Sequence, residues 1–308
     1  MDRITLDAGP LRAGIDPTLG ACLTEFSLRG PCDDRYPLMR RAPGGPTDPA
    51  ECSSFLMGPW TNRIRDARFT FQNQPHQLRP NFPDGTAIHG VLRDAPWRVT
   101  DRTPVSVRMV YDSRAHEAAN FPFAFGSVFR VELAPEELTL DLSVTNLDDR
   151  PMPAGCGHHP YYPRTLMAAG EQVHLTAGVG ARYETTNCLP TGPAHDDAVC
   201  AARRGGGPLG DPNLDDVFSG FDSRAVITWP ESRVRLTMDC SEAFNHLVVF
   251  TPRLRADGPP LPWFCVEPCT MPNDGFNLMH TGQTDTGVRV LAPGESLETR
   301  VRFRVERL

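Results

Sequence analysis

The stretch of sequence that decides the fold class is LTLDLSV, at residues 138–144. Its apolar side chains alternate strictly with polar ones, and this period of two indicates a β-strand with one buried face. The alternation returns near the C-terminus, where VRFRVE at residues 301–306 places apolar side chains between charged ones. Further short segments with the composition of strands occupy residues 226–229, 234–238 and 246–250.

Turn signals separate many of these segments, and helical periodicity is scarce. Turn-forming residues cluster at 147–151 and 292–295, and 31 prolines and 26 glycines interrupt the chain often. Many short strands with almost no helix are typical of an all-β protein. The sequence therefore predicts a large antiparallel β-sandwich.

The length alone leaves the number of domains open. A chain of 308 residues would make about two domains of average size, although single all-β domains run to roughly 250 residues and beyond. Residues 40–54 and 190–213 look irregular, but neither segment is long or polar enough to require a domain boundary. We therefore expect one domain over residues 1–308.

Charge and basic composition exclude several classes of function. The net charge is −7, so the chain has no global positive field to hold a polyanion, and we expect no nucleic-acid partner. All 31 basic side chains are arginine, which neither forms a Schiff base nor acts as a general base near neutral pH. Lysine-dependent aldolases, pyridoxal-phosphate enzymes and P-loop kinases are therefore excluded.

The N-terminal residues and the cysteines bear on the compartment. The chain begins without the apolar run of a signal peptide, and no stretch approaches the roughly 18 apolar residues of a membrane span. Nine cysteines, an odd number, are scattered along the sequence. We therefore expect reduced thiols in a cytoplasmic protein that has no membrane partner.

Glu267 is the most informative single residue. It follows WFCV at residues 263–266, which is typical of a buried strand, and it precedes a proline that stops regular pairing. Desolvation at such a position raises the pKa of a carboxyl group, which suits a general base that works near neutral pH. The alternative is a buried glutamate that forms a salt bridge with one of the many arginines.

His158 and His159 come before Pro160 and two tyrosines. Histidine is the natural proton donor at neutral pH, and the neighbouring aromatic rings would suit the wall of a sugar pocket. The alternative is a core histidine that is satisfied by a backbone carbonyl. Cys156 lies close enough in sequence to raise a metal site, but no second ligand pair at zinc spacing accompanies it, so we expect no metal.

Asn62, Arg63 and Asp215 have the chemistry to bind a polyhydroxylated ligand. Asn62 and Arg63 supply a fork of donors, and Asp215 supplies a carboxylate acceptor. The alternative is a buried ion pair between Arg63 and Asp215 that joins two loops.

Taken together and in this order, the polar segments resemble the aldose 1-epimerase family of galactose mutarotase-like proteins. The resemblance spans about residues 10 to 305, and the closing LAPGES at residues 291–296 is similar to the family's final hairpin. Each motif alone is weak, whereas six in the family's order are specific. The matching residues are Asn62-Arg63-Ile64, His89-Gly90 with Trp97, His159-Pro160-Tyr161-Tyr162, Asp215 with Phe218, and Glu267-Pro268 with Asp274-Gly275-Phe276-Asn277.

The resemblance implies a β-supersandwich with a shallow pocket on its concave face, and a reaction that needs no cofactor or metal. It assigns Glu267 as the general base that removes the proton from the anomeric hydroxyl. His159 corresponds to the general acid that protonates the ring oxygen. His89 would help to hold the ring-oxygen side of the sugar, and the substrate hydroxyls would be bound by Asn62, Arg63 and Asp215.

Several points stay open at this stage. His158 and Asp216 each stand beside an assigned residue, so the sequence does not decide which member of either pair serves the site. Tyr162 stands where the family usually has phenylalanine, and residues 270–273 differ from the sequence that is commoner in the family.

The substrate and the partners also stay open. An arginine cluster near the first two motifs would suit a phosphorylated or acidic sugar, such as a hexose 6-phosphate. A non-catalytic carbohydrate-binding protein would keep the fold without turnover. We expect a small-molecule sugar as the ligand, and a monomer or a homodimer. The arginines of this cluster are Arg63, Arg65, Arg68, Arg79 and Arg93.

Overall fold

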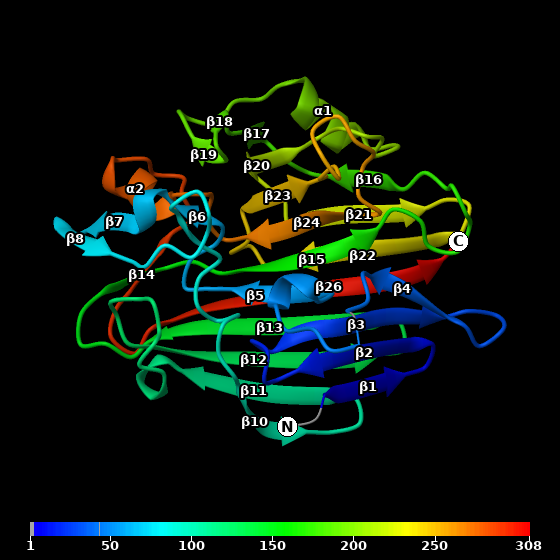
Figure 1. The fold of residues 1–308 in the computed structure, drawn as a ribbon, viewed down its shortest axis with the longest axis horizontal. Coiled ribbons are helices and arrows are strands. Elements are labelled where there is room, and N and C mark those ends of the chain that lie inside the picture. The colour runs from blue at the N-terminus through cyan, green and yellow to red at the C-terminus, as the bar shows by residue number, and fades with distance from the viewer. Residues whose placement is uncertain (1–2, 43) are drawn as a thin grey trace.

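The computed structural model describes residues 3–42 and 44–308, and two large antiparallel sheets dominate it (Figure 1). The first is a ten-stranded sheet, in which β4 (Arg35–Met39) pairs with β3 beside the main path. The order along that path is β1 (Ile4–Ala8), β2 (Leu11–Asp16), β3 (Cys22–Arg29), β5 (Ser54–Met57), β15 (Gly157–Pro163), β24 (Trp263–Cys269), β23 (His246–Phe250), β20 (Asp215–Ser219) and β17 (Ala181–Arg182).

The second is an eight-stranded sheet that begins as a meander of consecutive strands. Its order is β10 (Arg98–Arg102), β11 (Ser106–Asp112), β12 (Phe125–Ala134), β13 (Glu137–Asn146), β26 (Ser296–Arg307), β22 (Val234–Cys240), β21 (Arg224–Trp229) and β16 (His174–Ala177).

Short elements decorate the two sheets. The two-stranded pairs are β6 (Arg63–Ile64) with β9 (Ala87–Ile88), β7 (Arg68–Phe71) with β8 (Gln74–Gln77), β14 (Met152–Ala154) with β25 (Arg289–Leu291), and β18 (Thr185–Thr186) with β19 (Leu189–Pro190). The α-helices are α1 (Ala198–Gly205) and α2 (Gly275–His280), and 3₁₀ turns cover Pro49–Glu51, Arg65–Ala67 and Ser113–Ala115. In Figure 1, β6, β7, β8 and α2 gather at the left end of the molecule.

The predicted fold class is confirmed, and the five strand segments read from the sequence all lie in strands. LTLDLSV lies within β13, where its apolar side chains are buried and its polar ones are partly exposed. Residues 301–306 lie within β26 and residues 246–250 are β23. One expectation was wrong in part, because residues 190–213 include the helix α1. The Asp197 side chain caps this helix by accepting hydrogen bonds from the amides of Val199 and Cys200.

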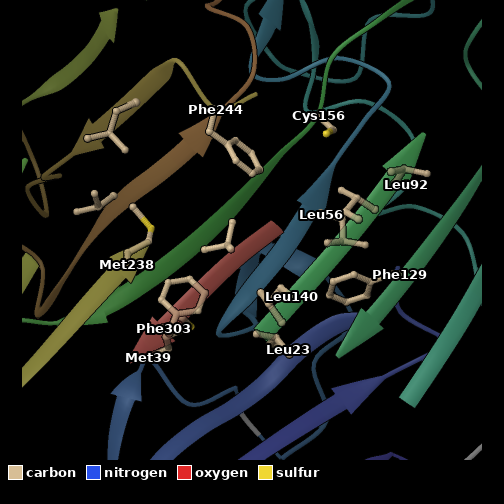
Figure 2. Packing of buried hydrophobic residues seen from close by; sticks show 14 of the residues in the cluster. Leu23, Met39, Leu56, Leu92, Phe129, Leu140, Cys156, Met238, Phe244 and Phe303 are labelled. Carbon is tan, nitrogen blue, oxygen red and sulfur yellow. The ribbon is translucent and has the colours of Figure 1, made fainter. Parts of the chain in front are cut away.

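The main core fills the space between the two sheets (Figure 2). Leu140 and Phe303 come from the eight-stranded sheet, and Leu23 and Leu56 come from the ten-stranded sheet. The rings of Phe26 and Phe303 lie 6.4 Å apart across the interface. Each such side chain contributes about 1.5–3 kcal/mol when it is removed from water, so this layer accounts for most of the favourable burial.

A second buried cluster lies on the other face of the ten-stranded sheet. We call it the outer cluster. The central strands of the ten-stranded sheet are therefore covered on both faces, and β23 is almost wholly buried as a result. None of the helices in the described part of the chain has the length and apolarity to cross a membrane. The buried members of the outer cluster are Cys22, Cys52, Phe55, Met57, Tyr161, Tyr183, Val217, Val248, Cys265 and Cys269.

Candidate active site

Strand register brings the candidate residues onto one face of the ten-stranded sheet. His159 in β15 stands opposite Phe55 in β5, and Glu267 in β24 stands opposite Val248 in β23. The adjacent row runs from Tyr161 through Cys265 and Phe250 to Asp215 in β20. Because side chains alternate along a strand, these residues all point to the same side as the outer cluster. The same alternation turns His158 and Tyr162 toward the main core.

His159 and Glu267 are in direct contact. The Nε2 atom of His159 lies 3.2 Å from Oε1 of Glu267, and the two residues are only 6% and 1% exposed. Burial raises the pKa of Glu267 well above its ordinary value, and the charge of nearby Asp215 adds to this rise. Burial also lowers the pKa of His159 to about 3, with a smaller contribution from Arg93. Both groups therefore favour their neutral forms in the empty pocket.

His159 lies in a stack of rings that is closed by a cation at each end. Its imidazole stacks on Phe55 at a centroid distance of 4.5 Å and on Tyr161 at 4.7 Å. The guanidinium of Arg93 lies 4.3 Å from the centroid of Phe55, and that of Arg40 lies 3.8 Å from the centroid of Tyr161. The stack fixes the orientation of the imidazole, and the two cations disfavour its protonation.

His89 reaches the pocket from the loop after β9. Its ring meets that of His159 edge to face at 5.1 Å, and its Nδ1 lies 3.1 Å from the sulfur of Met57. Burial lowers the pKa of His89 well below its ordinary value. Gly90 follows at φ +70°, and a Cβ atom there would lie 2.1 Å from the Gly58 carbonyl oxygen. Glycine is therefore required for the loop to pass this close to the strand that carries Met57.

Asn62 and Arg63 form one hydrogen-bonded unit on the pocket wall. The Oδ1 atom of Asn62 accepts hydrogen bonds from the amide and from Nη1 of Arg63, at 2.9 and 3.2 Å. Arg63 also donates from Nε to Asp84 at 2.9 Å. The expected alternative, an ion pair between Arg63 and Asp215, is not formed, because Arg63 is paired with Asp84 instead. No motif in the sequence pointed to Asp84, which lies in a polar loop.

The two neighbouring aspartates have different surroundings. Asp215 lines the pocket and accepts a hydrogen bond from the thiol of Cys188 at 2.9 Å. Asp216 is paired with Arg182 at 3.1 Å and does not line the pocket. The Cys188 loop is tied by Asn273, whose side-chain amide donates to the Cys188 carbonyl at 2.6 Å. Asn273 belongs to residues 270–273, whose sequence departs from the family pattern. This segment therefore supports the Asp215 side of the pocket.

The two neighbouring histidines also separate. His158 is buried in the main core between Phe129 and Phe244, with ring centroids 6.1 Å from each. Neither of its ring nitrogens has a hydrogen-bond partner within the described residues. Cys156 shares this core face, so the cysteine and histidine neighbours weighed as metal ligands point away from His159. Geometry thus selects His159 and Asp215 as the pocket-facing members of their pairs.

The remaining motif residues hold the pocket loops from behind. Asp274 accepts hydrogen bonds from the backbone amide of Arg65 at 3.0 Å and from the Asn277 side chain at 2.7 Å. Trp97 is buried and donates from its indole nitrogen to the Leu92 carbonyl at 2.9 Å. These contacts give the motif residues a structural role next to the candidate site.

The six candidate residues surround one pocket of about 570 Å³. A cavity of this size suits a small molecule. Arg93 also lines it and pairs with Asp48 at 2.8 Å and with Asp94 at 3.5 Å. Sequence reasoning did not single out Phe55, Asp48 or Asp94, because only the fold brings their segments to the motif residues. The full lining is Asp48, Ala50, Phe55, Asn62, Arg63, Asn81, Phe82, Ile88, His89, Arg93, Asp94, His159, Tyr161, Asp215, Phe250 and Glu267.

A second hollow, of about 490 Å³, lies on the solvent face of the eight-stranded sheet. Two of its charged residues, Arg300 and Asp141, form an ion pair at 2.6 Å on this surface. It brings together no buried acid and base, and the chemistry therefore points to the first pocket.

Comparison with known proteins agrees with this fold, which is a galactose mutarotase-like β-sandwich. The family model for aldose 1-epimerase matches residues 2–304, and the chain belongs to that family. The uncharacterized protein YphB of Escherichia coli K12 is 26% identical over 309 residues, with 98% of each chain covered.

Solved structures with lower identity share the fold. A galactose mutarotase-like protein from Clostridium acetobutylicum has a TM-score of 0.84 at 19% identity, covering 99% of this chain and 95% of that one. A GalM/aldose epimerase homologue from C. elegans has a TM-score of 0.81 at 16% identity, covering 100% and 99%.

Proposed function

We propose that this protein is an aldose 1-epimerase, which interconverts the α and β anomers of a free aldose. The observation that carries the proposal is the buried contact of 3.2 Å between Nε2 of His159 and Oε1 of Glu267 on the pocket wall. An acid and a base that touch each other can act together on two oxygen atoms bonded to one carbon. The anomeric hydroxyl and the ring oxygen of an aldose are such a pair.

The reaction is a proton exchange that opens and closes a hemiacetal. Glu267 takes the proton from the anomeric hydroxyl, His159 supplies a proton to the ring oxygen, and the bond between C1 and the ring oxygen breaks. The free aldehyde rotates about C1–C2 and closes again on its other face, with the roles of the two groups reversed. Acid–base help of this kind contributes about 10²–10⁴-fold per group.

The protonation state of the pair fits this cycle. The roles require a carboxylate at Glu267 and an imidazolium at His159, whereas burial favours the neutral form of each. A carboxylate beside an imidazolium holds the same number of protons as a carboxylic acid beside a neutral imidazole. The two arrangements differ only in whether His159 or Glu267 carries the shared proton. The pair therefore acts as one unit. Binding of a polar sugar beside it favours the charged arrangement that starts the reaction.

The other pocket residues supply contacts to sugar hydroxyls. Arg63 and Asn62 present donors from one wall, and Asp215 presents an acceptor from the strand two positions beyond β24. His89 meets His159 at its edge, on the side assigned to the ring oxygen. Phe250 and Tyr161 supply the apolar surface against which a sugar ring packs.

The charge of the pocket supports a neutral sugar over a phosphorylated one. Both arginines that line it are already paired, Arg63 with Asp84 and Arg93 with Asp48. Asp215 and Glu267 add two more acidic groups to the lining. A phosphate would therefore have to displace carboxylates from the arginines and sit beside further acids.

The test is the rate at which freshly dissolved α-D-glucose and α-D-galactose change anomer, followed by polarimetry or NMR. Wild type should accelerate the change, and Glu267→Gln, which keeps the shape of the side chain, should lose about 10²-fold or more. Asp215→Asn should raise KM, whereas its neighbour Asp216→Asn should leave KM unchanged in folded protein.

Two results would redirect the proposal. Acceleration confined to hexose 6-phosphates would assign the protein to phosphorylated sugars, against the charge argument above. If folded protein, checked by circular dichroism, accelerates anomer exchange of neither free nor phosphorylated sugars, a binding role would remain.

A further inference from the structure

Three potential metal ligands of different chemistry meet beside the pocket. A ring nitrogen of His159, Sγ of Cys265 and a carboxylate oxygen of Glu267 all lie within 4.8 Å of one another. Cys265 and Glu267 are two residues apart on β24 and share a face, and β15 brings His159 beside them. All three residues are buried. The cluster owes its existence to strand register rather than to a local sequence motif.

The separations suit a small tetrahedral cation. Bonds of about 2.0–2.1 Å from Zn²⁺ to nitrogen and oxygen place those two ligand atoms about 3.3 Å apart at a tetrahedral angle. Nε2 of His159 and Oε1 of Glu267 are 3.2 Å apart before any cation is bound. The sulfur, which lies within 4.8 Å of the other two ligand atoms of the cluster, would need to move by up to about 1.4 Å to complete a third bond of about 2.3 Å.

The surroundings favour a cation with affinity for sulfur and nitrogen. Oε2 of Glu267 is buried and has no hydrogen-bond partner within the described residues, so the carboxylate has coordination capacity to spare. Asp215, in the same row as Cys265, contributes negative charge close to Glu267. Hard cations such as Mg²⁺ and Ca²⁺ prefer six or more oxygen ligands, which this cluster lacks.

We propose that His159, Cys265 and Glu267 form an inhibitory binding site for a borderline or soft divalent cation, of which Zn²⁺ is the main case. Binding releases two protons to solvent, one from the Cys265 thiol and one from the Glu267 carboxyl group, and a pocket water or a sugar hydroxyl completes the coordination. Inhibition rests on the proposed function, because the cation occupies the nitrogen and the carboxylate that would exchange protons with the sugar. Binding itself does not depend on any activity.

Binding is tested first, with Co²⁺ as a spectroscopic substitute for Zn²⁺. Wild type should give the near-ultraviolet charge-transfer band of a cobalt–thiolate bond, and Zn²⁺ should displace it. Cys265→Ser should lose the band. Cys269→Ser is the matched control, because Cys269 is buried on the same strand and face but lies outside the cluster, and this variant should keep the band.

Inhibition is tested second, with each variant compared with its own metal-free rate. Zn²⁺ should slow anomer exchange by wild type, a chelator should restore the rate, and Mg²⁺ should have no effect. The Zn²⁺ concentration for half-inhibition should rise by about tenfold or more in Cys265→Ser, as for loss of a ligand, and stay unchanged in Cys269→Ser.

The outcomes separate this proposal from the proposed function. A cobalt–thiolate band that Cys265→Ser removes, in a protein silent on every sugar, would keep the cation site and refute the epimerase. Absence of the band from wild type, or inhibition equal in both cysteine variants, would overturn the cation site and leave the epimerase standing.

Discussion

In the eight-stranded sheet, charged side chains point to solvent and pair with one another. At the centre of the ten-stranded sheet, they are buried between two layers of protein. Arg300 pairs with Asp141 at 2.6 Å on the eight-stranded sheet, with side chains 58% and 29% exposed. Such surface pairs contribute about 0–1 kcal/mol to stability.

Where His159 and Glu267 meet in the ten-stranded sheet, burial lowers the pKa of His159 and raises the pKa of Glu267 well above its ordinary value. The difference teaches that burial on both faces of a sheet shifts the pKa values of its titratable groups.

The largest expected effect separates the two faces of β15. His159→Gln should lower kcat by about 10²–10⁴-fold, because it removes the group proposed to protonate the ring oxygen. His158→Gln should keep kcat within a few-fold in folded protein and lower stability instead, because His158 packs in the main core. Anomer exchange and thermal unfolding, measured on both variants, check this. Equal loss of kcat in the two would remove the distinction between the faces.

Truncation of apolar side chains should reveal the different burial of the two sheets. In β13, Leu140→Ala should cost about 2–5 kcal/mol, whereas Thr139→Ala should stay within about 0.5 kcal/mol. In β23, Val248→Ala and Val249→Ala should both destabilise, because both residues are buried on opposite faces. Denaturant unfolding measures each change. A tolerated Val248→Ala would show that the outer cluster contributes little.

Acid sensitivity should come from the ten-stranded sheet. Burial lowers the pKa of His158 to about 4 from its ordinary 6.5, so folding favours the neutral ring. This contribution is complete above pH 6.5 and is lost as the pH falls through 4, by up to about 3 kcal/mol. His158→Phe should flatten the decline of unfolding free energy in this window, and the exposed His195→Gln should not. Parallel declines in wild type and His158→Phe would contradict the assignment.

The smallest effect concerns the cations that close the ring stack. Arg93→Met removes a positive charge that lowers the pKa of His159, so that pKa should rise by up to about one unit. The acidic limb of the profile of kcat against pH should then move to higher pH. Arg130→Met, on the solvent face of the eight-stranded sheet, should leave the profile in place. A lower kcat with an unmoved limb would show that Arg93 only supports the structure.

The same contrast explains what could be predicted from the sequence. LTLDLSV has one solvent-exposed face and one buried face, so the alternation of its polar and apolar residues indicated a strand. WFCV, which ends before Glu267, is covered on both faces and has no alternation, so the sequence predicted a buried strand there but could not give its orientation. The motif residues were found through resemblance to a family, which carries their identity without their geometry.

Other features depend on contacts between distant segments. The choice between His158 and His159 rests on which face of β15 meets the eight-stranded sheet, and no local pattern records this. The pairing of Arg63 with Asp84 and of Arg93 with Asp48 likewise follows from how loops meet over the outer cluster. These ion pairs changed the substrate argument, because the two counted arginines that line the pocket are already paired with carboxylates.

The strand order of the ten-stranded sheet also has a consequence for how the protein is made. Its centre joins β5, β15 and β24, which lie far apart along the chain, whereas β10 to β13 pair with their sequence neighbours. Local pairings of this kind form early, and long-range ones are delayed by the entropy of closing large loops. A growing chain can therefore complete the meander long before Glu267 has been synthesised. The proposed epimerase activity should accordingly be among the last properties to appear during synthesis or refolding.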